Sequence, residues 1–113
     1  MNQAVWAHLE QLPEREVRPG VFLRILVGQR LMFSAVRFAP HAIVPTHHHP
    51  HEQMGIVLDG ELELWIEEER RTLRHGDMYT VPPNVPHGAE TKDAPCLVLD
   101  VFHPLREDYV RLF

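Results

Sequence analysis

The chain has 113 residues, of which 16 are acidic and 11 basic, giving a formal net charge of −5. This length suits one hydrophobic core, and we expect residues 1–113 to form a single domain. The acidic balance argues against a nucleic-acid partner, which requires a basic patch. No basic leader and no long apolar run occurs, so we expect neither a secretion signal nor a membrane span. Cys96 is the only cysteine, which fits a buried thiol in a cytoplasmic protein.

Short apolar runs separated by turns, together with ten prolines and six glycines, predict an all-β fold. The first two strands are expected at residues 21–27 and 31–39, joined by a turn at residues 28–30. Asp59-Gly60 is typical of a two-residue hairpin, here between strands at 53–58 and 61–67. The charged residues 67–71 are expected to form a solvated turn. Further strands are predicted at 72–74, 78–81, 88–91 and 96–103.

The segment 45–53 is rich in histidine and carries the first candidate site. Side chains alternate faces along an extended chain, so His47 and His49 are expected on one face, with Gln53 further along the same strand. Two imidazoles on one face can bind one metal ion. An affinity tag is excluded because the run is internal and interrupted by Pro50. A solvated loop that binds metals loosely is the remaining alternative.

A second cluster favours a true metal site. Residues 45–60 resemble the first motif of the cupin family, and residues 76–87 resemble its second motif. Asn84 stands where that family usually has glycine, and asparagine also tolerates a left-handed backbone. The resemblance implies a jelly-roll β-barrel that brings both motifs together around a central cavity. It also implies one divalent metal ion, bound by His47, His49, Gln53 and His87.

Gln53 departs from the family pattern, in which the corresponding ligand is usually glutamate. A neutral amide leaves the metal with its full positive charge, which favours Lewis-acid chemistry over redox cycling. His51 could replace Gln53 as a ligand or orient another ligand through a hydrogen bond; the cupin spacing favours Gln53. Three imidazoles and an amide suit Ni, Zn, Mn, Fe or Co.

Residues 99–109, within the closing strand and tail at 96–109, resemble the closing segment of the KdgF-type small cupins, which act on unsaturated uronates from pectin or alginate breakdown. The resemblance implies a metal-dependent enzyme that linearises 4,5-unsaturated uronate monomers to open-chain 5-keto-4-deoxyuronates. Its partner would be a small anionic sugar. The implied catalytic residues are Asp100, which would move a proton, Arg106, which would pair with the substrate carboxylate, and Phe102, which would pack against the sugar ring.

Asp100 is the only polar residue in the apolar stretch from Cys96 to Phe102. Alternation places it on the same face as Val98 and Phe102, so it should meet a cation, hydrogen-bond donors or a wet cavity. A structural salt bridge to an arginine is the alternative for Asp100, and an exposed surface position is the alternative for Arg106. The candidate arginine partners of Asp100 are Arg24, Arg37 and Arg106.

Two other functions remain open at this point: a metal-dependent oxygenase and a non-catalytic sugar-binding cupin. A homodimer formed by strand exchange is expected, because barrel edges and the apolar residues 4–6 would otherwise be exposed. Five large apolar residues are expected in the core or in an interface: Trp6, Phe22, Phe33, Met54 and Trp65.

Overall fold

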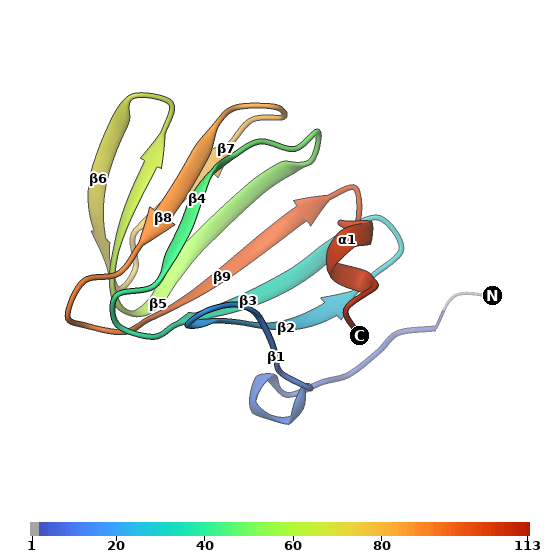
Figure 1. Ribbon diagram of the computed structural model, residues 1–113. Coiled ribbons are helices and arrows are strands. Elements are labelled where there is room, and N and C mark those ends of the chain that lie inside the picture. The colour runs from blue at the N-terminus through green and yellow to red at the C-terminus, as the bar shows by residue number, and fades with distance from the viewer. Residues whose placement is uncertain (1–2) are drawn as a thin grey trace.

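The computed structural model describes residues 3–113, and nearly all of its regular structure is β-strand (Figure 1). The predicted all-β class is therefore confirmed. In chain order the elements are a short 3-10 helix (Leu9–Gln11), β1 (Arg15–Arg18), β2 (Val21–Val27), β3 (Met32–Phe38), β4 (Ile43–His47), β5 (Glu52–Ile66), β6 (Glu69–Arg74), β7 (Met78–Val81), β8 (His87–Glu90), β9 (Cys96–His103) and α1 (Glu107–Val110).

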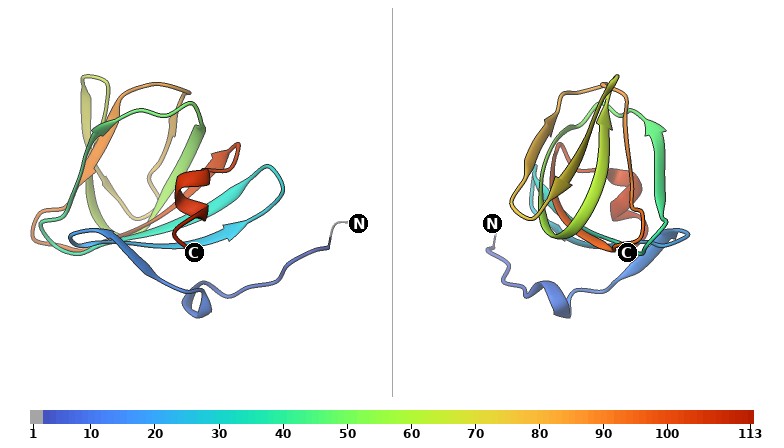
Figure 2. Two further views of the ribbon diagram at one scale, coloured as in Figure 1. Left: turned by 45° about the vertical axis from the view of Figure 1, so that its right-hand side comes forward. Right: turned by 90° about the vertical axis from the view of Figure 1, so that its left-hand side faces the viewer.

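The strands form an antiparallel sheet in the order β1-β2-β3-β9-β5-β8-β4, with β6 and β7 also paired to β5. The sheet curls round on itself, and α1 lies at the side where the curl stays open (Figure 2). Strands that are distant in sequence, such as β4 and β8, thereby become neighbours. This curl brings the two histidine-containing segments together.

The predicted hairpin at Asp59-Gly60 is wrong, because β5 continues through both residues. The register of β5 against β9 shifts between Val57 and Asp59, and Gly60 adopts φ +81°. A β-carbon on Gly60 would run into the Pro95 carbonyl. Asp59-Gly60 therefore forms part of a β-bulge that bends one long strand. The first part of β5 pairs with β7 and β9, and the second part pairs with β6 and β8.

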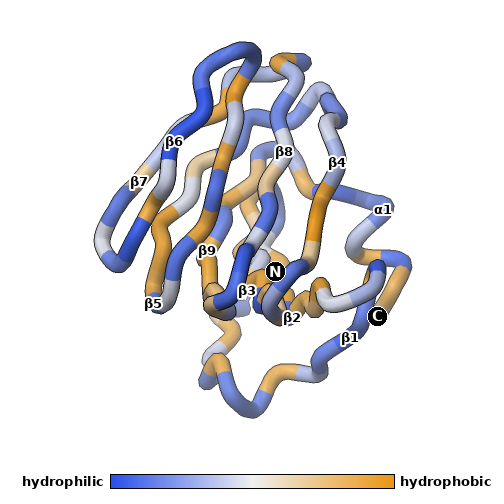
Figure 3. The backbone as a smooth tube through the Cα atoms, turned by 60° about the vertical axis from the view of Figure 1, so that its left-hand side comes forward, coloured by the Kyte–Doolittle hydropathy of each residue, from blue (hydrophilic) through white to orange (hydrophobic). Residues whose placement is uncertain are grey.

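Most other strand predictions are confirmed within one residue. The turn after β5 lies at residues 67–68, so the strand expected at 72–74 begins earlier, at Glu69. The turn at residues 28–30 is closed by a backbone hydrogen bond of 2.8 Å from Gly28 N–H to the Leu31 carbonyl. Alternation of apolar and polar residues is visible along the strands, whereas β6 is mostly hydrophilic (Figure 3).

The buried core is aliphatic and includes Val57, Leu62 and Val98. Cys96 is buried, as expected. A core position, one of the two places expected for the large apolar residues, is wrong for three of them: Trp6 is 93% exposed, and Phe33 and Met54 are about half exposed. Their place in an interface stays a prediction. Phe22 and Trp65 are partly buried. Within residues 3–113, no helix has the length and apolar character needed to cross a membrane.

Candidate metal and substrate site

Three of the predicted ligands converge where β4 ends and β8 begins. His47 and His87 are register partners, and their ring centroids lie 4.4 Å apart. The His49 ring centroid lies 4.9 Å from that of His87. One ligand atom from each of the three rings lies within 4.8 Å of the others. This geometry can hold one metal ion.

His49 reaches this cluster by a different route from the one predicted. The expectation that His47, His49 and Gln53 share one strand is wrong, because β4 ends at His47 and β5 begins at Glu52. His49 lies in the connection, interrupted by Pro50, which cannot donate a ladder hydrogen bond. Asn84, at φ 65°, holds this connection through a 2.7 Å hydrogen bond from its N–H to the His49 carbonyl.

The hydrogen bonds of the three rings leave a lone pair available on each. Every Nδ1 lies 2.8–3.2 Å from the carbonyl oxygen of a residue two positions away. Because a carbonyl only accepts, Nδ1 carries the proton and Nε2 is the acceptor. Nε2 of His87 is buried with no hydrogen-bond partner among the described residues. A metal ion would satisfy this atom, so the residues present fit a metal site.

Gln53 completes the cluster from β5 and is 7% exposed. Its Oε1 lies 3.1 Å from Nε2 of His49, so two acceptor atoms face each other. A cation between them removes this repulsion. The Gln53 side chain also forms a hydrogen bond with Asp100. Because a carboxylate can only accept, the amide nitrogen of Gln53 must face Asp100, and the amide oxygen then faces the histidines.

His51 stands outside the group of three converging imidazoles. Its ring centroid lies 5.3 Å from that of His49 and 6.5 Å from that of Phe102. The main-chain carbonyl of His51 accepts the hydrogen bond from His49 Nδ1, at 3.2 Å. His51 therefore orients His49 through its backbone.

Burial lowers the pKa of all three converging histidines. For His49, burial and then the charge of Arg106 lower the pKa to about 4. The imidazoles are thus neutral at pH 7, which is the form that binds metals.

A cavity of ≈330 Å³ opens beside these residues, within the range of about 300–1,000 Å³ typical of small-molecule sites. Its apolar side is formed by core residues such as Val98 and Phe102. Its polar wall includes His47, Gln53, Tyr79, His87, Asp100 and Arg106.

Asp100 is 6% exposed and accepts a hydrogen bond from the Tyr79 hydroxyl. Burial raises the pKa of Asp100 to about 6, although the hydrogen bonds from Tyr79 and Gln53 oppose this shift. The alternative of a structural salt bridge is wrong for all three arginines considered: Arg24 and Arg37 pair with Glu14, and Arg106 pairs with Asp108.

Tyr79 was not among the residues predicted for this site. A signal was present in Gly55, an isolated glycine inside β5, since glycine in a strand often marks a close approach of other groups. A β-carbon at Gly55 would overlap both the Tyr79 hydroxyl and the Asp100 carboxylate. The missing side chain makes room for this hydrogen-bonded pair.

Arg106 is 8% exposed, so the alternative of a surface arginine is wrong. Its Nε and Nη2 donate to the Asp108 carboxylate at 3.3 and 2.7 Å. The guanidinium lies 3.7 Å from the ring centroid of Tyr109 and 5.1 Å from that of Phe102. Stacking and pairing together fix the orientation of Arg106 at the cavity wall.

Comparisons with known proteins agree with this architecture. The model of the cupin domain matches residues 34–102. The pectin degradation protein KdgF of Dickeya dadantii is 33% identical over 103 residues, which cover 89% of this chain and 94% of that protein. The structure of KdgF from Halomonas sp. superposes with a TM-score of 0.88 at 31% identity, covering 95% of this chain and 99% of that chain. An RmlC-like cupin from Shewanella frigidimarina gives a TM-score of 0.88 at 30% identity, covering 96% of this chain and 99% of the other.

Proposed function

The chain belongs to the cupin family and, within it, to the KdgF-type small cupins; from this premise we propose that it is a metal-dependent enzyme of uronate breakdown. It converts 4,5-unsaturated uronate monomers into open-chain 5-keto-4-deoxyuronates. The proposal depends on one observation: the same cavity wall contains a group that can bind a metal ion and groups that can bind and react with a sugar acid. A cluster of neutral imidazoles lies beside a buried carboxylate and a buried arginine.

The metal ligands in this proposal are His47, His49, His87 and Gln53. A divalent ion held by them, whether Ni, Zn, Mn, Fe or Co, would act as a Lewis acid on a substrate oxygen. All four ligands are neutral, so they do not reduce the Lewis acidity of the metal ion.

Asp100 is the proton-transfer group in this proposal. The substrate is a cyclic hemiacetal whose ring oxygen also belongs to an enol ether. Asp100 accepts the proton of the C1 hydroxyl, the C1–ring oxygen bond breaks, and the resulting enol is protonated at C4 to give the 5-keto product. No net oxidation occurs. Because the pKa of Asp100 is about 6, this carboxyl group can both accept and donate a proton near neutral pH.

Arg106 binds the substrate carboxylate, because a planar guanidinium can form paired hydrogen bonds to it. Nη1 is the guanidinium nitrogen not used in the hydrogen bonds to Asp108. Phe102, 2% exposed and lining the cavity, packs against the sugar ring. A net charge of −5 disfavours an anionic ligand elsewhere on the surface.

The test is anaerobic turnover of freshly generated 4,5-unsaturated galacturonate, followed by loss of its ultraviolet enol-ether absorbance. Metal-loaded protein should exceed the spontaneous rate, chelated protein should not, and Asp100→Asn should retain metal but lose turnover. Saturable binding without product would instead indicate a sugar-binding cupin. Oxygen consumption with a phenolic or thiol substrate would indicate an oxygenase.

We further propose that the enzyme is a single cupin domain spanning residues 1–113 and that it works in the cytoplasm as a homodimer. Support for the dimer comes from apolar side chains on the outer face of the sheet. Phe33 of β3, Val101 of β9 and Met54 of β5 lie in register across three strands. Sedimentation velocity of wild type and Phe33→Glu would test it, since a charge in this row should yield monomers.

A further inference from the structure

We propose that Trp65 is a positioning residue of the metal site, acting from the outer face of the sheet on the two strands that carry His47 and His87. The indole contacts Thr46 and Gly88, the immediate neighbours of these two ligands. This inference rests on the metal-binding part of the proposed function, and it does not depend on the substrate.

Strand register places Trp65 opposite the ligand rings. Trp65 of β5 is the register partner of Gly88 in β8, one residue after His87. Because successive residues of a strand point to opposite faces, His87 faces the cavity and the Gly88 position faces outward. His47 pairs with His87, so Thr46 lies on the same outer side as Trp65.

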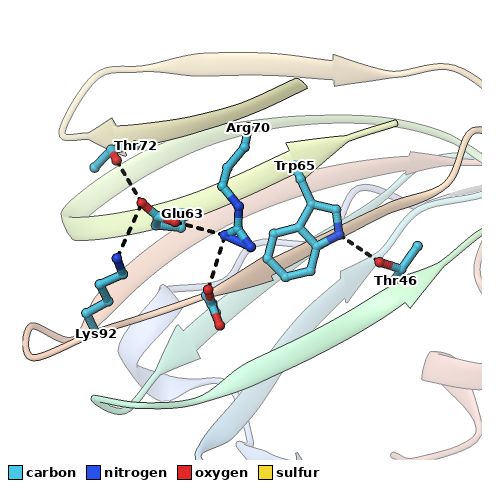
Figure 4. A network of polar contacts seen from close by, with 7 residues as sticks. Thr46, Glu63, Trp65, Arg70, Thr72 and Lys92 are labelled. Atoms are coloured by element: carbon cyan, nitrogen blue, oxygen red, sulfur yellow. Dashed lines mark hydrogen bonds and ion pairs between the residues drawn. The ribbon is translucent and has the colours of Figure 1, made fainter. Parts of the chain in front are cut away.

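Two contacts join the indole to the ligand strands. Trp65 Nε1–H donates a hydrogen bond of 2.8 Å to Thr46 Oγ1 (Figure 4). Gly88 has no side chain, so the ring lies directly against its backbone; a β-carbon there would come within 2.7 Å of the indole nitrogen. The indole therefore bridges β4 and β8 next to both ligands.

Arg70 of β6 lies over the indole, with its guanidinium 4.4 Å from the ring centroid. Arg70 is itself held by an ion pair to Glu63 at 2.8 Å (Figure 4) and by a second one to Glu90 at 3.1 Å. Arg70 and Gly88 are the register partners of Trp65 in the two neighbouring strands, so contacts from both strands fix the ring.

The backbone at this point needs such support. Pairing between β4 and β8 is irregular between Val44 and His47, so the ladder alone does not fix the end of β4. His47 is the last residue of that strand. Metal affinity depends on how well the ligands are held, and groups beyond the ligands contribute to it.

The test measures Zn²⁺ affinity by competition with a chromophoric chelator. Thr46→Val removes the acceptor of the indole hydrogen bond and should weaken Zn²⁺ binding by about threefold to tenfold, the effect of one ordinary hydrogen bond. Thr46→Ser keeps the hydroxyl and should bind like wild type. Thr72→Val is the matched control, because the Thr72 hydroxyl belongs to the same outer network through Glu63, 3.1 Å away, but adjoins no ligand.

Equal Zn²⁺ affinity in Thr46→Val and Thr72→Val overturns the inference, whether both match wild type or both are weakened. If circular dichroism shows Thr46→Val to be unfolded, Trp65→Phe supplies the same comparison, since it keeps a ring over Gly88 and loses only the donor. A wild type that binds no Zn²⁺ overturns this inference and the metal-dependent function together. The predicted affinity pattern without uronate turnover overturns the proposed function alone.

Discussion

Tyr79 and Asp100 form a hydrogen-bonded pair in the cavity wall, where the phenolic O–H of β7 donates to a carboxylate of β9. Strand β5 lies between β7 and β9. Gly55 of β5 is the register partner of both Tyr79 and Asp100, and its missing side chain leaves space for the pair. Burial raises the pKa of Tyr79 well above its usual value, so the hydroxyl remains a donor at neutral pH. Tyr79 thereby fixes which way the proposed proton-transfer group points.

Tyr79→Phe should leave the buried Asp100 carboxylate with one donor fewer. We expect the free energy of unfolding at pH 8 to fall by about 1–3 kcal/mol, the cost of an unsatisfied buried polar group. Urea unfolding measures this change. Tyr109→Phe is the control, because no hydrogen bond from the Tyr109 hydroxyl occurs among residues 3–113. An equal loss in both variants would contradict the assignment.

Gln53→Glu should tighten Zn²⁺ binding by about tenfold or more, because a carboxylate adds a negative charge next to the ion. Turnover should fall, since the metal becomes a weaker Lewis acid and a second carboxylate faces Asp100. Competition titration and the initial rate measure the two effects. Gln29→Glu makes the same change in an exposed turn and should alter neither. Unchanged Zn²⁺ affinity in Gln53→Glu would exclude residue 53 as a ligand.

Arg106→Lys should keep the positive charge but lose the planar fork and the stacking on Tyr109. We expect the KM for the uronate to rise roughly tenfold, with a smaller change in kcat, because a charge-assisted contact to the substrate is lost. Steady-state kinetics separate the two constants. Arg111→Lys, at an exposed position of the tail, is the control. A KM equal to that of wild type would remove Arg106 from substrate binding.

Cys96 should be nearly inert to thiol reagents in the folded protein. Burial, with a smaller effect of the Asp59 charge, raises the pKa of its thiol to about 12. Because the shift is upward, the reactive thiolate forms only as the pH approaches that value, and at pH 8 it is scarce. Reaction with an aromatic disulfide should be at least about 100-fold slower than in the urea-unfolded chain, because burial raises the pKa of the thiol to about 12 and unfolding removes that effect. Similar rates in both states would place Cys96 at the surface.

Local signals in the sequence were enough for most strands and for the metal cluster. Strands β2, β7 and β9 follow from short runs of largely apolar residues between turns, which are a property of neighbouring residues. The histidines stand at the spacing of two recognisable motifs, so their convergence could be expected once those motifs were matched. The burial of Asp100 and Phe102 followed from the two-residue period of one strand.

Tertiary structure alone decided the rest, because it depends on residues that are distant in sequence. Asp59-Gly60 has the same local preference in a hairpin and in a bulge; close packing against Cys96, a register partner in β9, selects the bulge. Tyr79 meets Asp100 only because β5 pairs with β7 on one edge and β9 on the other. Alternation along a strand indicates which side chains share a face, whereas the curl of the sheet decides which of the faces is buried and which buried side chains touch.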